Sequence, residues 1–427
     1  MTTSYFHRAA AKLLFLFTLL FSFTMLGAMA CLAGVSEQDV FNFDGYRGGS
    51  SPIDRAIFDR EGNLYGVTQL GGTYNAGIAF KLTPASDGTW TETVLHNFGG
   101  AHDGGTPSGQ LTFDSSGNLY GTTQVGGTQR CYQAQCGTVF ELSPQASGEW
   151  TETVLYTFDY YHGSVPLGGV IFDKSQNLYG VATYGGPSGA GTVFELKRGT
   201  SGWKLFVLHE FSDSDGFSPL GGLIQDGEGN LWGVTQLGGP TNHGTVFEMV
   251  GSGGRWTFKS VYDFKGGHDG ISPSGRLAMD KSGNFYGMTV LGGSGQCKNE
   301  PGCGTVFELS PSGTSWTEKI IHNFRGGSDG ALPEISSLGI DGNGDLYGTT
   351  TYGGTGACDS QGLKGCGIVF RLIHSNGSWT EDVIHMFPGS AADGAFPEGG
   401  VTFNKHIYGL ASALGYSLGG AVFEISK

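Results

Sequence analysis

Short runs rich in Val, Thr and aromatic residues follow one another along most of this chain. Gly, Ser, Asp or Pro bounds each run, and no window carries the apolar spacing of an amphipathic helix. Runs of this composition predict β-strands joined by tight turns. One stretch of the chain shows four such runs in succession, at residues 107–114, 118–125, 137–142 and 150–158. Four antiparallel strands joined in this way predict one blade of a propeller.

The four-run pattern repeats along the chain, and the phrase Asn-Leu-Tyr-Gly or a close variant marks each copy. Its central aromatic residues are Tyr65, Tyr120, Tyr179, Trp232, Tyr286, Tyr347 and Tyr408. A period of this size indicates one supersecondary unit repeated seven times. Because both faces of a blade pack against neighbouring blades, we interpret these aromatic residues as core rather than as sugar-stacking platforms.

The fourth run of the unit begins with Trp only six times, at Trp90, Trp150, Trp203, Trp256, Trp316 and Trp379. The chain ends after the third run of its last unit, and it begins with Asp39-Val-Phe-Asn-Phe43, which matches the end of a fourth run. We therefore predict an all-β, seven-bladed β-propeller with four antiparallel strands per blade. An N-terminal strand completes the last blade and closes the ring, which removes exposed sheet edges. We expect the propeller to form a single domain over residues 38–427 and the protein to be a monomer.

Two spaced phrases carry a resemblance to a known family. Gly-Asn-Leu-Tyr-Gly-Thr-Thr…Gly-Gly and Gly-Thr-Val-Phe-Glu-Leu recur in this order from about Asp39 to Ile425. The chain resembles the GloVer-type tandem repeat of secreted bacterial proteins. The resemblance implies a secreted, propeller-like protein and assigns no activity to particular residues.

The first thirty residues differ from the rest. A basic start precedes an almost wholly apolar run from Leu13 to Leu26 and the small-residue site Ala28-Met29-Ala30. This order predicts a signal peptide over residues 1–30, followed by a short linker over 31–37. A membrane anchor is the rival interpretation, but the run is short for a span. We expect a secreted, periplasmic or cell-surface protein without a transmembrane segment in the mature chain. Cys31 leaves a lipoprotein open as an alternative.

Six further cysteines fall into close pairs within the loops of three repeats. The second cysteine of each pair directly precedes a strand glycine. Equivalent placement predicts three local disulfides rather than zinc ligands, since no histidine stands beside them at ligand spacing. The expected pairs are Cys131–Cys136, Cys297–Cys303 and Cys358–Cys366.

Charge adds one exclusion. The net charge is −15 and the sequence pI is about 5.1, and no basic patch is visible, so we expect no nucleic-acid partner.

Candidate chemistry lies where the repeat breaks. One residue after the Pro that begins the first strand stand Glu334 and Glu398, and three residues after it stand Arg55, Gln110 and Arg276. A strand period of two places these positions on one face, near the mouth of the central channel. Two Glu residues from adjacent units could act as a glycosidase-type acid/base pair. The alternative is that polar residues there simply face water.

The connections between units carry a second set of candidates, one carboxylate in each of five Asp-Gly turns. These residues are Asp103, Asp215, Asp269, Asp329 and Asp393. They could bind cations or sugar hydroxyls, although repetition favours capping of the turns. Asp341-Gly-Asn343-Gly-Asp345 also resembles the start of a calcium loop but lacks the glycine and glutamate that follow in such loops. We expect no metal site and no cofactor, with calcium at this loop left open.

The function expected from these features is extracellular binding, in which a rigid disc presents loops to a glycan or a cell-surface partner. An extracellular polysaccharide hydrolase or lyase that uses Glu334 and Glu398 in the central funnel is the second hypothesis. A purely structural surface protein is the third.

Overall fold

The computed structural model describes residues 36–99, 102–127, 136–360, 362–390, 393–414 and 417–426. The chain divides into two compact units, one of Gln38–Glu424 and one of Met1–Glu37 with Ile425–Lys427. The expected signal peptide and Cys31 lie outside the described residues. No helix in the described part of the chain is long and apolar enough to cross a membrane.

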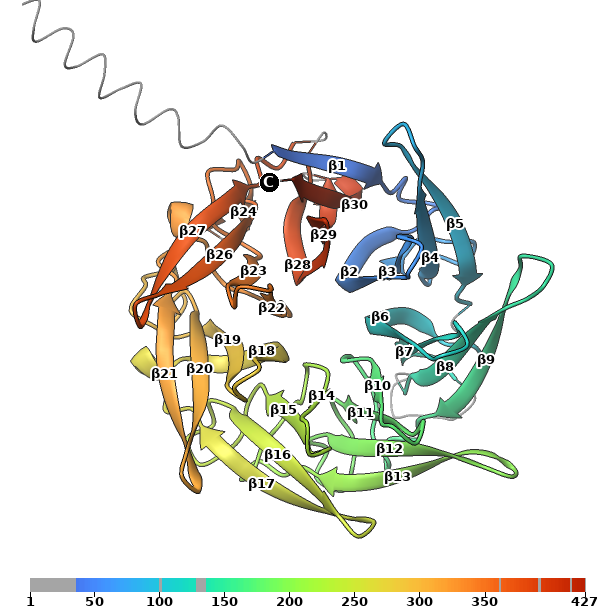
Figure 1. Cartoon of the computed structure of the whole chain (residues 1–427), viewed down its shortest axis with the longest axis horizontal. Coiled ribbons are helices and arrows are strands. Elements are labelled where there is room, and N and C mark those ends of the chain that lie inside the picture. Colours follow the sequence, from blue (N-terminus) through green and yellow to red (C-terminus); the bar gives the residue numbers. More distant parts are fainter. Residues whose placement is uncertain are drawn as a thin grey trace, which may run out of the picture. The chain divides into compact units, whose positions relative to one another are not determined.

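The unit Gln38–Glu424 contains seven four-stranded antiparallel sheets arranged as the blades of a ring, as predicted (Figure 1). The first six blades follow one another along the chain. Their strands are β2 (Ser50–Phe58), β3 (Leu64–Leu70), β4 (Ile78–Pro84) and β5 (Trp90–Asn97) in blade 1; β6 (Gly105–Phe113), β7 (Leu119–Val125), β8 (Thr138–Pro144) and β9 (Trp150–Thr157) in blade 2; β10 (Val170–Phe172), β11 (Leu178–Ala182), β12 (Thr192–Gly199) and β13 (Gly202–Glu210) in blade 3; β14 (Ile224–Gln225), β15 (Leu231–Thr235), β16 (Thr245–Ser252) and β17 (Arg255–Asp263) in blade 4; β18 (Ile271–Met279), β19 (Phe285–Leu291), β20 (Thr305–Ser312) and β21 (Ser315–Asn323) in blade 5; and β22 (Gly339–Ile340), β23 (Leu346–Thr350), β26 (Ile368–Ser375) and β27 (Ser378–Met386) in blade 6.

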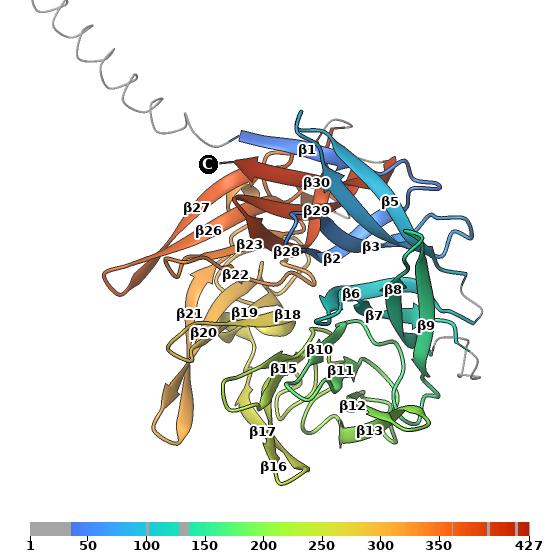
Figure 2. The ribbon, with the colours of Figure 1, turned by 45° about the vertical axis from the view of Figure 1, so that its right-hand side comes forward.

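Blade 7 joins the two ends of the chain. Its strands β28 (Ala395–Asn404), β29 (His406–Leu414) and β30 (Ser417–Ser426) come from the C-terminal part, and β1 (Ser36–Asn42) pairs with β30 as the outer strand. Figures 1 and 2 both show β1 beside β30. The backbone N–H of Phe43 donates to the carbonyl of Gly420 at 2.9 Å. The predicted closure of the ring by the N-terminal strand is therefore confirmed.

The Asn-Leu-Tyr-Gly phrase closes the hairpin between the first two strands of a blade. In blade 1, Asp59 accepts hydrogen bonds from the backbone of Asn63, the Asn63 amide and the Tyr65 hydroxyl. In blade 4 the Trp232 indole N–H donates to Asp226 in the same way, at 2.9 Å. The seven aromatic side chains are only 0–5% exposed. They are core residues, as interpreted from the sequence.

The glycine of the phrase makes room for the phenylalanine of the third strand. A β-carbon at Gly66 would lie 2.6 Å from the Phe80 ring, and the same holds in every blade. Because real β-carbons do not come that close, a side chain at this position would displace the ring. The glycine and the phenylalanine therefore recur together.

A second set of phenylalanines, one per blade, connects each blade to the next by ring contacts. Each lies just after an outer strand and packs edge-on against the third-strand phenylalanine of the following blade, with ring centroids 5.0–5.2 Å apart. Phe43 makes this contact with Phe80, and Phe387 makes it with Phe423. Edge-to-face aromatic pairs contribute about 0.5–1.5 kcal/mol beyond burial, so the ring is held by the same contact at all seven junctions.

Two of the three expected disulfides are present, Cys297–Cys303 and Cys358–Cys366. They clamp the loops between the second and third strands of blades 5 and 6. The second loop also contains the small hairpin of β24 (Asp359–Ser360) and β25 (Leu363–Lys364). Cys131 lies outside the described residues, so its pairing with Cys136 stays a prediction.

Candidate functional site

The inner strand of a blade carries a bulge at the positions where the sequence predicted an uninterrupted strand. In blade 1, Ile53 pairs with Val67 and the next pair joins Ile57 to Tyr65. Between these two pairs β2 moves on by four residues while its partner β3 moves on by only two. Asp54 in this bulge has φ 62°, a left-handed conformation that is uncommon for residues other than glycine. The expectation that the five register residues share one strand face by a period of two is therefore wrong. A bulge interrupts that period in blades 1, 2, 5 and 7, and Glu334 lies before β22, outside the strand.

The bulges of neighbouring blades press against one another around the axis of the ring. A β-carbon at Gly109 of blade 2 would lie 2.1 Å from the backbone N of Gly169 in blade 3. A β-carbon at Gly221 would lie 1.9 Å from the carbonyl oxygen of Gly275, and a β-carbon at Gly275 would lie 2.0 Å from the carbonyl oxygen of Ser336. Glycine is required at these points because the backbones themselves are in contact.

Arg276 reaches across this ring of bulges. Its Nη1 donates to Gln110 Oε1 at 2.9 Å and its Nη2 donates to the Gly168 carbonyl at 3.2 Å, so it joins blade 5 to blades 2 and 3. Loss of hydration raises the pKa of Asp54 to about 6, and the charge of Arg276 opposes that rise. Burial and the charge of Arg276 lower the pKa of Arg55 to about 10. Arg276 and Gln110 thus form a polar network at the axis that joins blades 2, 3 and 5, and the charges of Asp54 and Arg55 lie close enough to Arg276 to interact with it.

Glu334 and Glu398 form a separate pair. Burial raises the pKa of Glu398 to about 7, and the negative charge of Glu334 adds to the rise. The pKa of Glu334 is also raised, chiefly by burial and then by Glu300. None of the axial arginines contributes to either shift. The five register residues therefore divide into an axial network and a carboxyl pair that interacts with neither arginine.

Glu334 opens into a cavity of about 270 Å³ between the loops of blades 5 and 6. Lys298, Asn299 and Glu300 of the Cys297–Cys303 loop form one wall. Leu363 of the hairpin in the Cys358–Cys366 loop and the ring of Tyr352 form another. The two loops meet here, since a β-carbon at Gly362 would lie 2.5 Å from Lys298 Nζ. Two disulfide-clamped loops and Glu334, which precedes the inner strand of blade 6, therefore build this concave surface.

The sequence indicated Glu334 but not the residues that surround it. Lys298, Asn299 and Glu300 stand in a loop for which the sequence predicted a disulfide and no binding role. Two consecutive repeats carry long loops with a cysteine pair, and neighbouring blades of a ring place such loops side by side. This combination is the signal in the sequence that points to a shared surface between the two loops.

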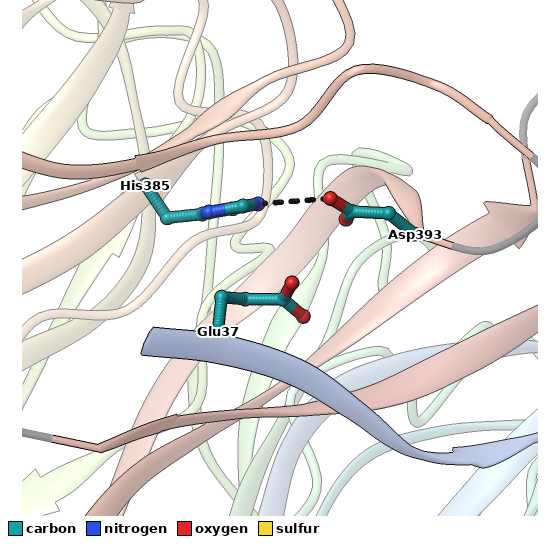
Figure 3. A group of neighbouring side chains, drawn as sticks. All are labelled: Glu37, His385 and Asp393. Atoms are coloured by element: carbon teal, nitrogen blue, oxygen red, sulfur yellow. Dashed lines mark ion pairs between the residues drawn. The ribbon is translucent and has the colours of Figure 1, made fainter. Parts of the chain in front are cut away.

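The aspartates of the interblade connections lie at separate junctions, one in each connection. Asp103, Asp215, Asp269 and Asp329 each accept a hydrogen bond from a backbone N–H of the same connection. Most also meet a side chain of the preceding outer strand, as in the His96–Asp103 pair at 3.0 Å. Figure 3 shows the corresponding His385–Asp393 ion pair, at 3.4 Å. The hydrogen bonds to loop backbone fit the capping role.

The calcium alternative concerns the hairpin at Asp341. Asp341 accepts from the backbone of Asn343 and Asp345, as the corresponding aspartates do in other blades. Asp345 is already paired with the Arg371 guanidinium, at 2.6 Å. An arginine on one of the two carboxylates supplies the positive charge that a calcium ion would bring.

Comparison with known proteins accounts for the repeat. A family model described as the Gloeobacter/Verrucomicrobia repeat matches residues 32–225, 132–358 and 200–423. The chain belongs to this family. Its three overlapping matches show that the Gloeobacter/Verrucomicrobia repeat runs through nearly all of the propeller. No functionally curated protein matches the sequence.

Solved structures share the fold of this Gloeobacter/Verrucomicrobia repeat protein at low sequence identity. An ulvan lyase, a polysaccharide lyase, is 10% identical over 90% of this chain and 95% of its own, with a TM-score of 0.51. An ulvan lyase structure with bound GlcA(1-4)Rha3S is 9% identical over 91% of this chain and 94% of its own, with a TM-score of 0.50. A putative oxidoreductase (glucose dehydrogenase) from Thermus thermophilus is 14% identical over 82% of this chain and 99% of its own, with a TM-score of 0.45. At these identities the likeness shows the fold alone.

Proposed function

We propose that this protein is an extracellular glycan-binding propeller that holds one end or one residue of a glycan in the Glu334 cavity. The observation that carries the proposal is the cavity itself, in which four polar side chains stand among five apolar or aromatic ones. Small-ligand sites are concave and combine apolar surface with a small number of placed polar groups that orient the ligand. The volume of about 270 Å³ suits a single sugar ring better than a long chain.

The chemistry of the walls fits a saccharide. Lys298 and the Asn299 amide donate hydrogen bonds, the carboxyls of Glu300 and Glu334 accept them, and a sugar hydroxyl does both. Leu332, Leu363 and the Tyr352 ring supply apolar surface for the C–H face of a sugar.

The disulfides give the cavity its rigidity. Cys297–Cys303 and Cys358–Cys366 each close a short loop, one on each side of the cavity. The bonded cysteines are 6 and 8 positions apart in the sequence. Loops fixed before binding lose less conformational entropy when a ligand arrives. Disulfides persist in oxidising compartments, which supports an extracellular location.

The test is a glycan array probed with the mature protein and two variants. Glu334→Leu removes the carboxyl from the cavity, and Glu228→Leu makes the same change of charge at an exposed turn of blade 4. Wild type and Glu228→Leu are expected to bind the same glycans, while Glu334→Leu loses at least about tenfold in affinity. Equal binding by Glu334→Leu would reject the cavity as the site. Absence of binding by the wild type would favour the purely structural surface protein.

One observation favours a second function, hydrolysis or lyase cleavage of a polysaccharide. Glu398 has its pKa raised to about 7 and interacts with Glu334, and a carboxyl with a pKa near the working pH is suited to act as a general acid or base. The variant Glu398→Gln distinguishes the two functions. Catalysis by the pair predicts that a glycan bound by wild type is cut and that Glu398→Gln binds it without cutting. Intact glycan after long incubation with wild type would leave binding as the function.

A further inference from the structure

Three side chains from two blades converge at the junction of blades 5 and 6. His322 lies near the end of β21 in blade 5, and Asp329 lies in the 3-10 turn η3 (Gly327–Asp329) of the connection. Glu381 lies in β27, the outer strand of blade 6. The imidazole and the two carboxyls are each about 15–20% exposed. We propose that His322, Asp329 and Glu381 bind a divalent transition-metal cation, zinc in the first instance, that cross-links blades 5 and 6.

The distances fit ligands around an ion better than hydrogen bonds. His322 Nε2 lies 3.6 Å from Asp329 Oδ1 and 3.5 Å from Glu381 Oε1. The three ligand atoms all lie within 4.8 Å of one another. Nitrogen and oxygen ligands at about 2.0–2.2 Å from a tetrahedral zinc ion are separated by roughly 3.3–3.5 Å. The imidazole is therefore spaced from both carboxyls as a ligand set would be.

Two of the ligand atoms have no other partner. His322 Nε2 and Glu381 Oε1 are shielded from solvent, and neither has a hydrogen-bond partner among the described residues. A buried polar atom without a partner costs about 1–3 kcal/mol. Such atoms in a folded protein call for an explanation, of which an ion is one. An ion at the centre of the three ligands satisfies both atoms at once.

The charges at the junction also favour a cation. Asp329 and Glu381 bring two carboxyls to one imidazole, with the ligand atoms within 4.8 Å of one another. The charge of Arg325 acts on Glu381, and Asp382 adds a further negative charge. A divalent ion among the three ligands would offset the repulsion between the two carboxylates.

Two other junctions of the ring satisfy the equivalent positions without an ion. At the junction of blades 3 and 4, Phe258 replaces the glutamate and its ring stacks on His209, with centroids 3.9 Å apart. At the junction of blades 4 and 5, Tyr262 replaces the histidine and its hydroxyl donates to Asp269 at 2.6 Å. In each case a change of residue removes the set of three ligands. These junctions are internal controls for the proposed site.

The ligand set indicates the class of ion. One imidazole and two carboxylates suit zinc or manganese, whereas calcium takes six to eight oxygen ligands. The protein supplies three ligands, so water completes the coordination. Spacing along the chain does not predict this site, since residues 322, 329 and 381 come from two repeats.

The experiment uses the mature protein freed of metal with a chelator and titrated with zinc chloride, manganese chloride or calcium chloride. Calorimetry and the melting temperature Tm are read for wild type, His322→Gln and Glu381→Gln. The controls are His209→Gln and Glu318→Gln, which change the equivalent positions at the junctions of blades 3 and 4 and of blades 4 and 5. Glu381→Gln keeps the shape of the side chain and removes its charge.

Wild type and both controls are expected to bind zinc at the His322 site, with at least one ion per chain and a rise in Tm. His322→Gln and Glu381→Gln are expected to lose that rise and more than about tenfold in zinc affinity. Three results would overturn the proposal: zinc binding that is unchanged in Glu381→Gln, no binding near one equivalent in wild type, or stabilisation by calcium alone.

Discussion

Blades 3 and 4 and blades 5 and 6 are built on the same backbone but carry different chemistry. In the first sector the residue after the inner-strand proline is Leu220, and the outer-strand junction is the stacked pair His209–Phe258. In the second sector the corresponding residues are Glu334 and the group His322, Asp329 and Glu381. Only the second sector has loops clamped by disulfides.

The difference teaches where a repeat protein places its function. Contacts that hold the ring, such as Phe211–Phe247 and Phe324–Phe370, are the same in both sectors. The scaffold therefore does not explain why Glu334 and the two clamped loops stand in blades 5 and 6 and not in blades 3 and 4. The sector of blades 3 and 4 serves as a control for every claim about the other.

The largest loss of stability is expected from a substitution that should destabilise both sectors by the same amount. Gly233→Ala in blade 4 and Gly348→Ala in blade 6 each place a β-carbon 2.6–2.7 Å from a buried phenylalanine ring. Overpacking of this kind should lower the free energy of unfolding by about 2–3 kcal/mol in either blade. Urea denaturation of the two variants measures it. A blade that accepts alanine without loss would show that the two scaffolds differ.

Removal of a clamp comes next and concerns only blades 5 and 6. The double variant Cys358→Ser, Cys366→Ser opens a loop of 8 residues in sequence separation. The loss should be about 2 kcal/mol, because the unfolded chain regains freedom. Thermal melting of the variant beside wild type checks this, with Ser312→Ala at an exposed hairpin as control. Unchanged melting together with unchanged glycan affinity would mean that the clamp is dispensable.

Exchange of one residue between the two junctions should have a smaller effect, of opposite sign in the two sectors. In chelator, Glu381→Phe copies the aromatic junction and should raise stability by about 1 kcal/mol, since apolar replacements of buried charged groups are often stabilising. Phe258→Glu makes the reverse change beside His209 and Asp215, and it should lower stability. Melting temperatures of both variants decide the point. Destabilisation by Glu381→Phe would show that the charged group is favourable without metal.

The last comparison concerns pH dependence. The pKa of Glu381 is raised from 4.5 to about 9 in the folded protein, so the folded state binds a proton that the unfolded state has released. The stability that this bound proton contributes is complete below about pH 4.5 and is lost as the pH rises towards 9. In chelator, Glu381→Gln should therefore lose less stability than wild type between pH 5 and 9. A parallel fall in both proteins would contradict the raised pKa.

The fold followed from the sequence because its signals repeat. Seven copies of one phrase fixed the register of the second strand, and the missing seventh Trp showed that Asp39–Phe43 completes the last blade. The two disulfides that the structure describes followed from equivalent placement in the loops. Each signal needed only local spacing.

The axial residues did not follow, because a strand period was applied across a bulge. Asp54 and Ile335 adopt positive φ although neither is glycine, and neither residue type announces such a conformation. Glu334 was therefore grouped with Arg276, although the structure places Arg276 in a network with Gln110. The junction of His322 with Glu381 was missed for another reason, since blade stacking and not spacing brings them together.

Hydrogen–deuterium exchange with and without the glycan found on the array tests most directly whether function lies in blades 5 and 6. Protection is expected in residues 297–303 and 351–366, which flank the Glu334 cavity. The corresponding loops of blades 3 and 4, residues 183–191 and 236–244, should exchange as before. Protection confined to the loops of blades 3 and 4, or to any surface away from the Glu334 cavity, would contradict the assignment.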